Sequence, residues 1–138
     1  FYGVKGQGAY CNDEKLCISK TTQFDQAFMS TGFVAESREV LSEQLKIFEE
    51  VVWKARAIRR PGAAAYDLAL IASGVFDLYW EKNLKPWDSA AGILLVKEAG
   101  GVIKTFEGDD YNPFKKSLIA GNQTIVEKFQ QEIQKIIK

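Results

Sequence analysis

The side chains of this sequence that are best suited to chemistry are carboxylates, because the chain contains no histidine. That composition excludes His-based triads, His general bases and most zinc or iron sites. Cys11 and Cys17 are the only two thiols, and their spacing does not match a C-x-x-C metal or redox motif. A cross-strand disulfide would fit their spacing, but we expect reduced thiols of the kind found in the cytosol.

Asp88 lies in the stretch with the strongest local signals, residues 86–101. Pro and Trp precede it, small and apolar residues follow, and Gly100 and Gly101 end the pattern. This arrangement predicts a helix with Asp88 at the N-cap, where the carboxylate accepts backbone N–H bonds. A carboxylate fixed at a helix start can also bind a hard cation, and Mg²⁺ usually takes one or two protein carboxylates together with phosphate oxygens. On the residues alone, both roles stay open.

Glu81 is the second carboxylate of interest. It follows residues 75–80, which alternate and are rich in aromatic and β-branched types, so they predict a strand that delivers Glu81 into a loop. One loop would then carry Glu81 and Asp88 to the carboxyl end of a strand, where open α/β sheets place their sites. The alternative interpretation of Glu81 is an ordinary surface charge.

Residues 62–65 are small, and at the start of a helix they would leave backbone N–H groups accessible to an anion. A basic run that contains Lys54, Arg56, Arg59 and Arg60 leads into this segment. We interpret the run as a solvated strand edge, with a phosphate-facing cluster as the alternative.

These residues must be positioned by an alternation of strands and helices. The patterns predict an N-terminal hairpin that pairs residues 10–11 with 16–18 across the turn 12–15. They also predict strands over 27–33, 55–58, 75–80, 102–106 and 118–121, and helices over 40–52, 62–74, 88–99 and 123–137, with Asn122 capping the last. This order indicates an α/β fold, a layered sandwich of mixed β-sheet and helices.

The overall composition is that of one globular domain, with 138 residues, 46% of them hydrophobic and 26% charged. Eighteen basic residues balance eighteen acidic ones, so no global field draws the chain to nucleic acid or anionic lipid. No apolar run of membrane-spanning length occurs. We therefore expect no direct nucleic-acid binding, no membrane partner and a cytoplasmic location.

Two motifs resemble the inositol monophosphatase family. The sequence W-D-S-A-A-G at 87–92, followed by E-A-G-G at 98–101, resembles the C-terminal signature, and R-R-P-G-A-A-A-Y-D-L-A at 59–69 resembles the helix motif upstream of it. The resemblance covers essentially the whole chain. It implies the C-terminal portion of the sugar-phosphatase fold and a Mg²⁺-dependent phosphomonoesterase that hydrolyses inositol monophosphate or a related sugar phosphate. Fructose 1,6-bisphosphate and 3′-phosphoadenosine 5′-phosphate are the alternative substrates.

The same resemblance implies a role for each candidate site residue. Asp88 would bind Mg²⁺, Glu81 would hydrogen-bond a hydroxyl of the polyol, and the backbone around Gly62, Ala63 and Ala64 would line the substrate pocket. Ala63 departs from the many relatives that carry Ser or Thr there, so its side chain offers the substrate no hydrogen bond. The attack on phosphorus is assigned to a metal-activated water, and no side chain of this chain is assigned as catalytic.

The remaining metal ligands of the family lie in a Glu-Glu motif and an Asp-Pro-x-Asp-Gly-Thr motif, which we place before Phe1. We therefore expect residues 1–138 to be the C-terminal region of such a phosphatase, inactive alone, with residues 1–35 completing a sheet of the missing part. We expect a homodimer, because cutting the family fold exposes apolar surface. The alternative is a non-catalytic protein-interaction module built on the half-fold.

Overall fold

The main sheet is mixed and has five strands in the order β5-β4-β6-β8-β7 in a computed structural model, which describes residues 1–137. Strand β4 is parallel to β5 and to β6, whereas β8 is antiparallel to β6 and to β7. The strands are β4 (Phe28–Thr31), β5 (Ala57–Arg59), β6 (Leu78–Lys82), β7 (Val102–Lys104) and β8 (Ser117–Gly121).

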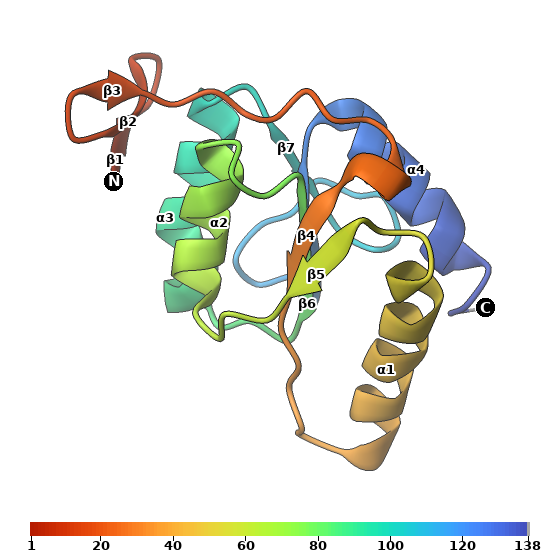
Figure 1. Ribbon diagram of the computed structural model, residues 1–138. Coiled ribbons are helices and arrows are strands. Elements are labelled where there is room, and N and C mark those ends of the chain that lie inside the picture. The colour runs from red at the N-terminus through yellow and green to blue at the C-terminus, as the bar shows by residue number, and fades with distance from the viewer. Residues whose placement is uncertain (138) are drawn as a thin grey trace.

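Helices cover both faces of this sheet, which confirms the α/β sandwich (Figure 1). Helices α2 (Ala64–Ala72) and α3 (Pro86–Glu98) pack together on one face, and α1 (Arg38–Val52) and α4 (Gln123–Gln134) lie on the other. Each face has its own apolar core, because both surfaces of the sheet are buried. Within residues 1–137, no helix combines the length and the apolar character that crossing a membrane requires.

Two of the helices begin at side-chain caps. Ser37 accepts a hydrogen bond from the Val40 N–H at 3.2 Å and so starts α1. Asn122 accepts from the Ile125 N–H at 3.0 Å and starts α4, as the sequence predicts. The amide of Asn122 also donates to the carbonyl oxygens of Ser19 and Thr21, at 3.0 and 2.8 Å. The same side chain therefore fixes the connection that precedes β4.

A small sheet precedes the main one and projects from the body of the molecule (Figure 1). It consists of β1 (Tyr2–Val4), β2 (Gly8–Cys11) and β3 (Glu14–Lys15), all antiparallel. Its turn is shorter than predicted, because Cys11 pairs with Glu14 and the positive φ of Asn12, 52°, reverses the chain within two residues. The predicted pairing of residues 10–11 with 16–18 is therefore wrong in its register, although the Leu16 N–H does bond to the Ala9 carbonyl at 2.8 Å.

A carboxylate of α3 holds the small sheet to the body. Glu98 accepts hydrogen bonds from the backbone N–H groups of Gly6 and Gly8, both at 2.9 Å.

Cys11 and Cys17 are free thiols. Strand β4 lies inside the main sheet, between β5 and β6. Within residues 1–35, the part that could complete a sheet of a missing region is therefore the small sheet β1–β3. That it does so remains a prediction.

Strand β6 begins later than its composition suggests. The N–H groups of Val75 and Phe76 bond to the Leu70 carbonyl at 3.0 and 3.3 Å, so this segment closes the end of α2 instead of entering the sheet. The strand therefore runs from Leu78 to Lys82, and Glu81 lies within it. The prediction that Glu81 lies in a loop is wrong.

Helix α3 begins two residues before Asp88. Pro86 occupies its first position, where the fixed φ of proline suits a helix and the missing N–H costs nothing. Lys85 is thus the N-cap residue, and the predicted N-cap at Asp88 is wrong. Asp88 is the third helical residue, and its Oδ2 accepts from the Lys85 N–H at 2.8 Å.

Candidate functional site

A hollow of about 290 Å³ lies where the three parallel strands end. Strands β5, β4 and β6 point the same way, so their carboxyl ends meet at one edge, which is where α/β sheets commonly bind ligands. The residues that line it come from these strand ends and from the starts of the helices that follow: Gly32, Val34, Glu36, Arg60, Gly62, Ala64, Glu81, Asn83, Leu84, Lys85 and Asp88.

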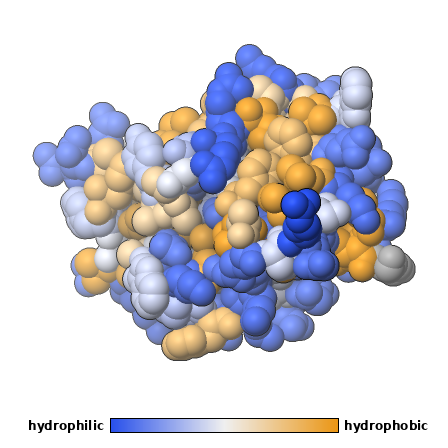
Figure 2. Space-filling model, turned by 90° about the horizontal axis from the view of Figure 1, so that it is seen from below, coloured by the Kyte–Doolittle hydropathy of each residue, from blue (hydrophilic) through white to orange (hydrophobic). Residues whose placement is uncertain are grey.

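This end of the molecule can be followed in the figures. Strands β4 and β5 run downward in Figure 1, so their carboxyl ends lie toward the face that Figure 2 presents. That face has hydrophobic surface near its middle, with hydrophilic side chains around and between the apolar patches (Figure 2). A ligand at this face would therefore meet both kinds of surface.

Four of the five predicted site residues line this hollow, namely Gly62, Ala64, Glu81 and Asp88. Ala63 does not line it. It is the N-cap residue of α2 and makes no side-chain cap bond, as its methyl group requires. The structure thus brings together a strand carboxylate, a helix carboxylate and the start of α2, which are separate in the sequence.

The start of α2 offers backbone donors. The N–H groups of Tyr66 and Asp67 bond to the Ala63 carbonyl at 2.9 Å, while those of Ala64 and Ala65 have no partner among residues 1–137. Such unpaired N–H groups, at the positive end of the helix dipole, favour an anion.

Arg60 lies in a different place from Arg59 and Lys54 of the same basic run. Arg60 lines the hollow, whereas Arg59 lies over the Phe28 ring at 5.1 Å and Lys54 pairs with Glu132. The positive φ of Gly62, 84°, turns the chain between Arg60 and the start of α2. Of the four basic residues in the run, only Arg60 lines the hollow, so the phosphate-facing interpretation applies to Arg60.

Asp88 presents one carboxylate oxygen that is free for a ligand. Its Oδ2 accepts from Lys85, and its Oδ1 has no hydrogen-bond partner within residues 1–137. A hard oxygen of this kind fits Mg²⁺. Among the described residues, however, no group of three or more Asp, Glu, Cys or His side chains could hold a metal ion. The donors present therefore fit one part of a metal site.

Glu81 is a partly buried carboxylate under several influences. Burial raises its pKa most strongly, and the negative charges of Asp67 and Asp88 raise it further. The hydroxyl of Tyr79, which donates to Oε2, and the positive charge of Arg60 act in the opposite direction. Glu81 is thus an acceptor whose charge depends on its neighbours.

Sequence reasoning missed three residues around Glu81. Gly32 lies next to it, Tyr79 donates to it, and Asp67 is a buried carboxyl group that acts on it through charge. Asp67 is 1% exposed, and its Oδ1 has no hydrogen-bond partner within the described residues. Burial raises the pKa of Asp67 to about 6. The only available signal was an acid within the otherwise apolar segment 64–72.

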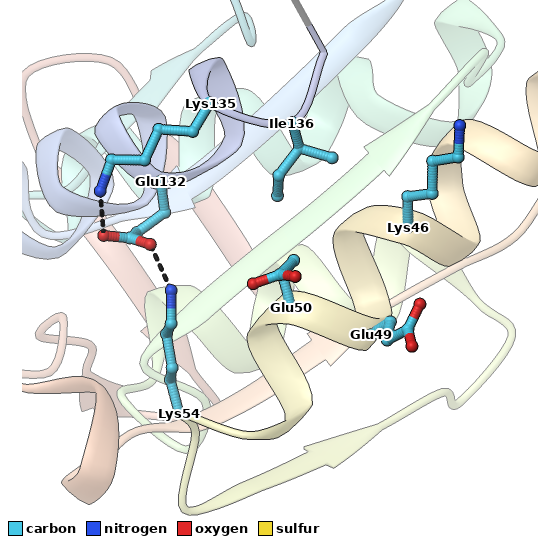
Figure 3. A pocket seen from close by; sticks show the side chains of 7 residues that line it. All are labelled: Lys46, Glu49, Glu50, Lys54, Glu132, Lys135 and Ile136. Atoms are coloured by element: carbon cyan, nitrogen blue, oxygen red, sulfur yellow. Dashed lines mark hydrogen bonds and ion pairs between the residues drawn. The ribbon is translucent and has the colours of Figure 1, made fainter.

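A larger hollow, of about 440 Å³, lies between α1 and α4 on the opposite face of the sheet (Figure 3). Glu132 lies between Lys54 and Lys135 and accepts a hydrogen bond from each. The charge of the Glu132 carboxylate is therefore neutralised by these two ammonium groups. Glu49 and Glu50 of α1 also line this hollow. They are a Glu-Glu pair within the chain itself, but they lie across the sheet from α3 and Asp88, so they do not complete its metal site.

Comparison with known proteins identifies relatives by their sequence. A model of the inositol monophosphatase family matches residues 1–138. The fructose-1,6-bisphosphatase/inositol-1-monophosphatase of Aquifex aeolicus is 41% identical over 91% of this chain and 46% of its own length. Nus factor SuhB of Xylella fastidiosa is 39% identical over 96% of this chain and 50% of its own.

A solved structure agrees with these sequence matches. The extragenic suppressor protein suhB of Bartonella henselae superimposes with a TM-score of 0.90 and 38% identity, over 96% of this chain and 52% of that one. The chain thus spans about half the length of the curated relatives named here.

Proposed function

Since the chain belongs to the inositol monophosphatase family, we propose that it forms the substrate-binding part of a Mg²⁺-dependent phosphomonoesterase. The substrate is inositol monophosphate or a related sugar phosphate. The observation that carries the proposal is the meeting of Glu81, Asp88 and the start of α2 in one hollow. A phosphate ester of a polyol has the three features that such a hollow can recognise: an anion, hydroxyl groups and affinity for a hard cation.

Each group of the hollow has a place in this proposal. The N–H groups at the start of α2 and the charge of Arg60 attract the phosphate, and the Glu81 carboxylate accepts a hydrogen bond from a hydroxyl of the polyol. Asp88 contributes one oxygen to Mg²⁺. When bound, Mg²⁺ lowers the pKa of water and stabilises the charge of the leaving oxygen.

We expect this chain to bind the substrate but not to turn it over. Asp88 alone supplies too few ligands for a firmly held cation, so residues 1–138 by themselves bind inositol 1-phosphate without hydrolysing it. Turnover needs the further acidic motifs that the family resemblance places upstream. The relative from Aquifex aeolicus is named for two substrates, so fructose 1,6-bisphosphate is the first alternative ester to compare.

The test is a binding titration of the 138-residue chain, followed by NMR, together with a phosphate-release assay in Mg²⁺. We expect shifts at the amides of residues 62–65 on addition of inositol 1-phosphate, and no phosphate release above background. An absence of shifts in that segment would contradict the proposed binding role and favour the protein-interaction module. Rapid hydrolysis by the isolated chain would contradict the placement of the missing ligands.

A further inference from the structure

Tyr79 and Glu81 lie two residues apart on β6, so their side chains project from the same face of the sheet. The Tyr79 side chain is fully buried, and its hydroxyl donates a hydrogen bond to Glu81 Oε2. This is the only hydrogen bond of the Tyr79 hydroxyl within residues 1–137. The polar atom of a buried phenol thus bonds to a carboxylate that lines the hollow.

Gly32 provides the space that this carboxylate occupies. It follows β4 directly, beside β6, where Thr31 is in register with Trp80. A Cβ atom at Gly32 would lie 2.2 Å from Glu81 Cδ and 2.2 Å from Oε2, far inside van der Waals contact. The φ angle of Gly32 is not positive, so the position needs glycine for space and not for its backbone conformation.

We propose that Tyr79 is a positioning residue, which together with the space at Gly32 orients the Glu81 carboxylate toward a hydroxyl of the substrate polyol. This inference rests on the proposed function. Because the Tyr79 hydroxyl engages Oε2, Glu81 Oε1 is left to accept from the ligand. A carboxylate held from one side has a fixed direction, which favours polyols that place a hydroxyl opposite it.

The electrostatic surroundings are consistent with this role. Asp67 and Asp88 are both negative groups near Glu81, and they favour its protonated form. Donation from Tyr79 opposes them and helps to keep Glu81 an acceptor. Tyr79 thus contributes to both the direction and the charge of the group that meets the substrate.

The first test compares Tyr79→Phe with Tyr10→Phe. Tyr10 is the matched control because its hydroxyl donates to the Gln7 carbonyl in the small sheet, away from the hollow. NMR titrations of the 138-residue chain measure the dissociation constants of inositol 1-phosphate and of inorganic phosphate. We expect Tyr79→Phe to weaken inositol 1-phosphate about tenfold, through the loss of one oriented hydrogen bond, and to leave inorganic phosphate and the control unchanged.

Two results of this titration would overturn the inference. Equal affinity of Tyr79→Phe and the unsubstituted chain for inositol 1-phosphate would mean that Tyr79 has no positioning role. An equal loss for both ligands would mean that the substitution disturbs the whole hollow and not the direction of Glu81.

A second test needs no ligand and so separates this inference from the proposed function. We expect crystal structures to show Glu81 in a different rotamer in Tyr79→Phe. We also expect Gly32→Ala to lower the unfolding midpoint in urea, and to lower it much less when Glu81 is also replaced by Ala. An unmoved Glu81, or equal effects of Gly32→Ala in both backgrounds, contradicts the inference. Failure of the unsubstituted chain to bind inositol 1-phosphate contradicts the proposed function instead.

Discussion

Asp88 accepts a hydrogen bond from the Lys85 N–H through Oδ2 at 2.8 Å, while its Oδ1 faces no hydrogen-bond partner within residues 1–137. The substitution Asp88→Asn keeps an oxygen for Lys85 and removes the negative charge. In a phosphatase that contains both this chain and the upstream acidic motifs, we expect this substitution to lower turnover by about a hundredfold or more. The thermal midpoint should change by only a few degrees, because the helix start is preserved.

The matched control for this substitution is Asp109→Asn. Asp109 is exposed and pairs with Lys115 at 3.3 Å in a surface turn. We expect its kcat and its dependence on Mg²⁺ concentration to equal those of the unsubstituted enzyme. If Asp88→Asn also retains both, then Asp88 is only a helix-start residue.

Asp67 predicts a pH dependence of stability. Burial raises the pKa of this carboxyl from its usual 3.8 to about 6, so the folded state favours the protonated form. The stabilising contribution is complete below about pH 4 and is lost as the pH rises through about 6. Relative to Asp67→Asn, the free energy of unfolding should fall by roughly 2.4 kcal/mol from pH 4 to pH 7.

Urea unfolding of both proteins across this range measures the difference. Asp25→Asn is the control for the substitution itself, since Asp25 is an exposed acid. Parallel curves for Asp67→Asn and the unsubstituted chain would show that Asp67 keeps its ordinary pKa.

Asn122 is expected to be a sensitive position for stability. Its side chain accepts from the Ile125 N–H and donates to two carbonyl oxygens near β4, so Asn122→Ala removes a helix cap and leaves Ser19 and Thr21 without their donor. We expect a loss of about 2 kcal/mol in urea unfolding. Asn112→Ala removes a comparable local bond in an exposed turn and should cost about 0.5 kcal/mol or less. Equal costs would contradict the bridging role of Asn122.

We also expect the chain to self-associate, as the homodimer prediction requires. Phe1 and Tyr66 are in edge-to-face contact at 6.2 Å between ring centroids, and each is half exposed. Covering these rings would bury apolar surface. Light scattering should show that Tyr66→Ser weakens the dimer, whereas Trp53→Ser, beyond α1 on the other face of the sheet, does not. A mass of 15.5 kDa at every concentration would contradict association.

Local patterns were sufficient to predict which segments form the main sheet and its helices, because periodicity and caps are properties of neighbouring residues. Asn122 and the alternation of strands and helices are examples. The errors occurred at boundaries, where another rule competed. At Asp88, proline two residues earlier determined the helix start. At Glu81, the hydrogen bonds from residues 75–76 back to α2 keep these residues out of the sheet, so β6 starts at Leu78 and includes Glu81.

The sequence was sufficient to name four residues that line the hollow, but not the residues that pack against them. Local patterns singled out Glu81, Asp88, Gly62 and Ala64, the family resemblance gave them roles, and the four share one hollow. The space at Gly32 depends on a contact between two strands that are far apart in the sequence, so no local pattern records it. Long-range packing of this kind becomes visible only when the sheet order is known.

The strand order of the main sheet also has a kinetic consequence. Met29 pairs with Leu78, and Leu78 pairs with Gly121, so the central strands join segments from distant parts of the chain. No pair of neighbouring strands in this sheet is joined by a tight turn. Large loops must therefore close before these strands can pair, so we expect the main sheet to fold slowly. Strands β1–β3, in contrast, pair only with their sequence neighbours and can form within microseconds of one another.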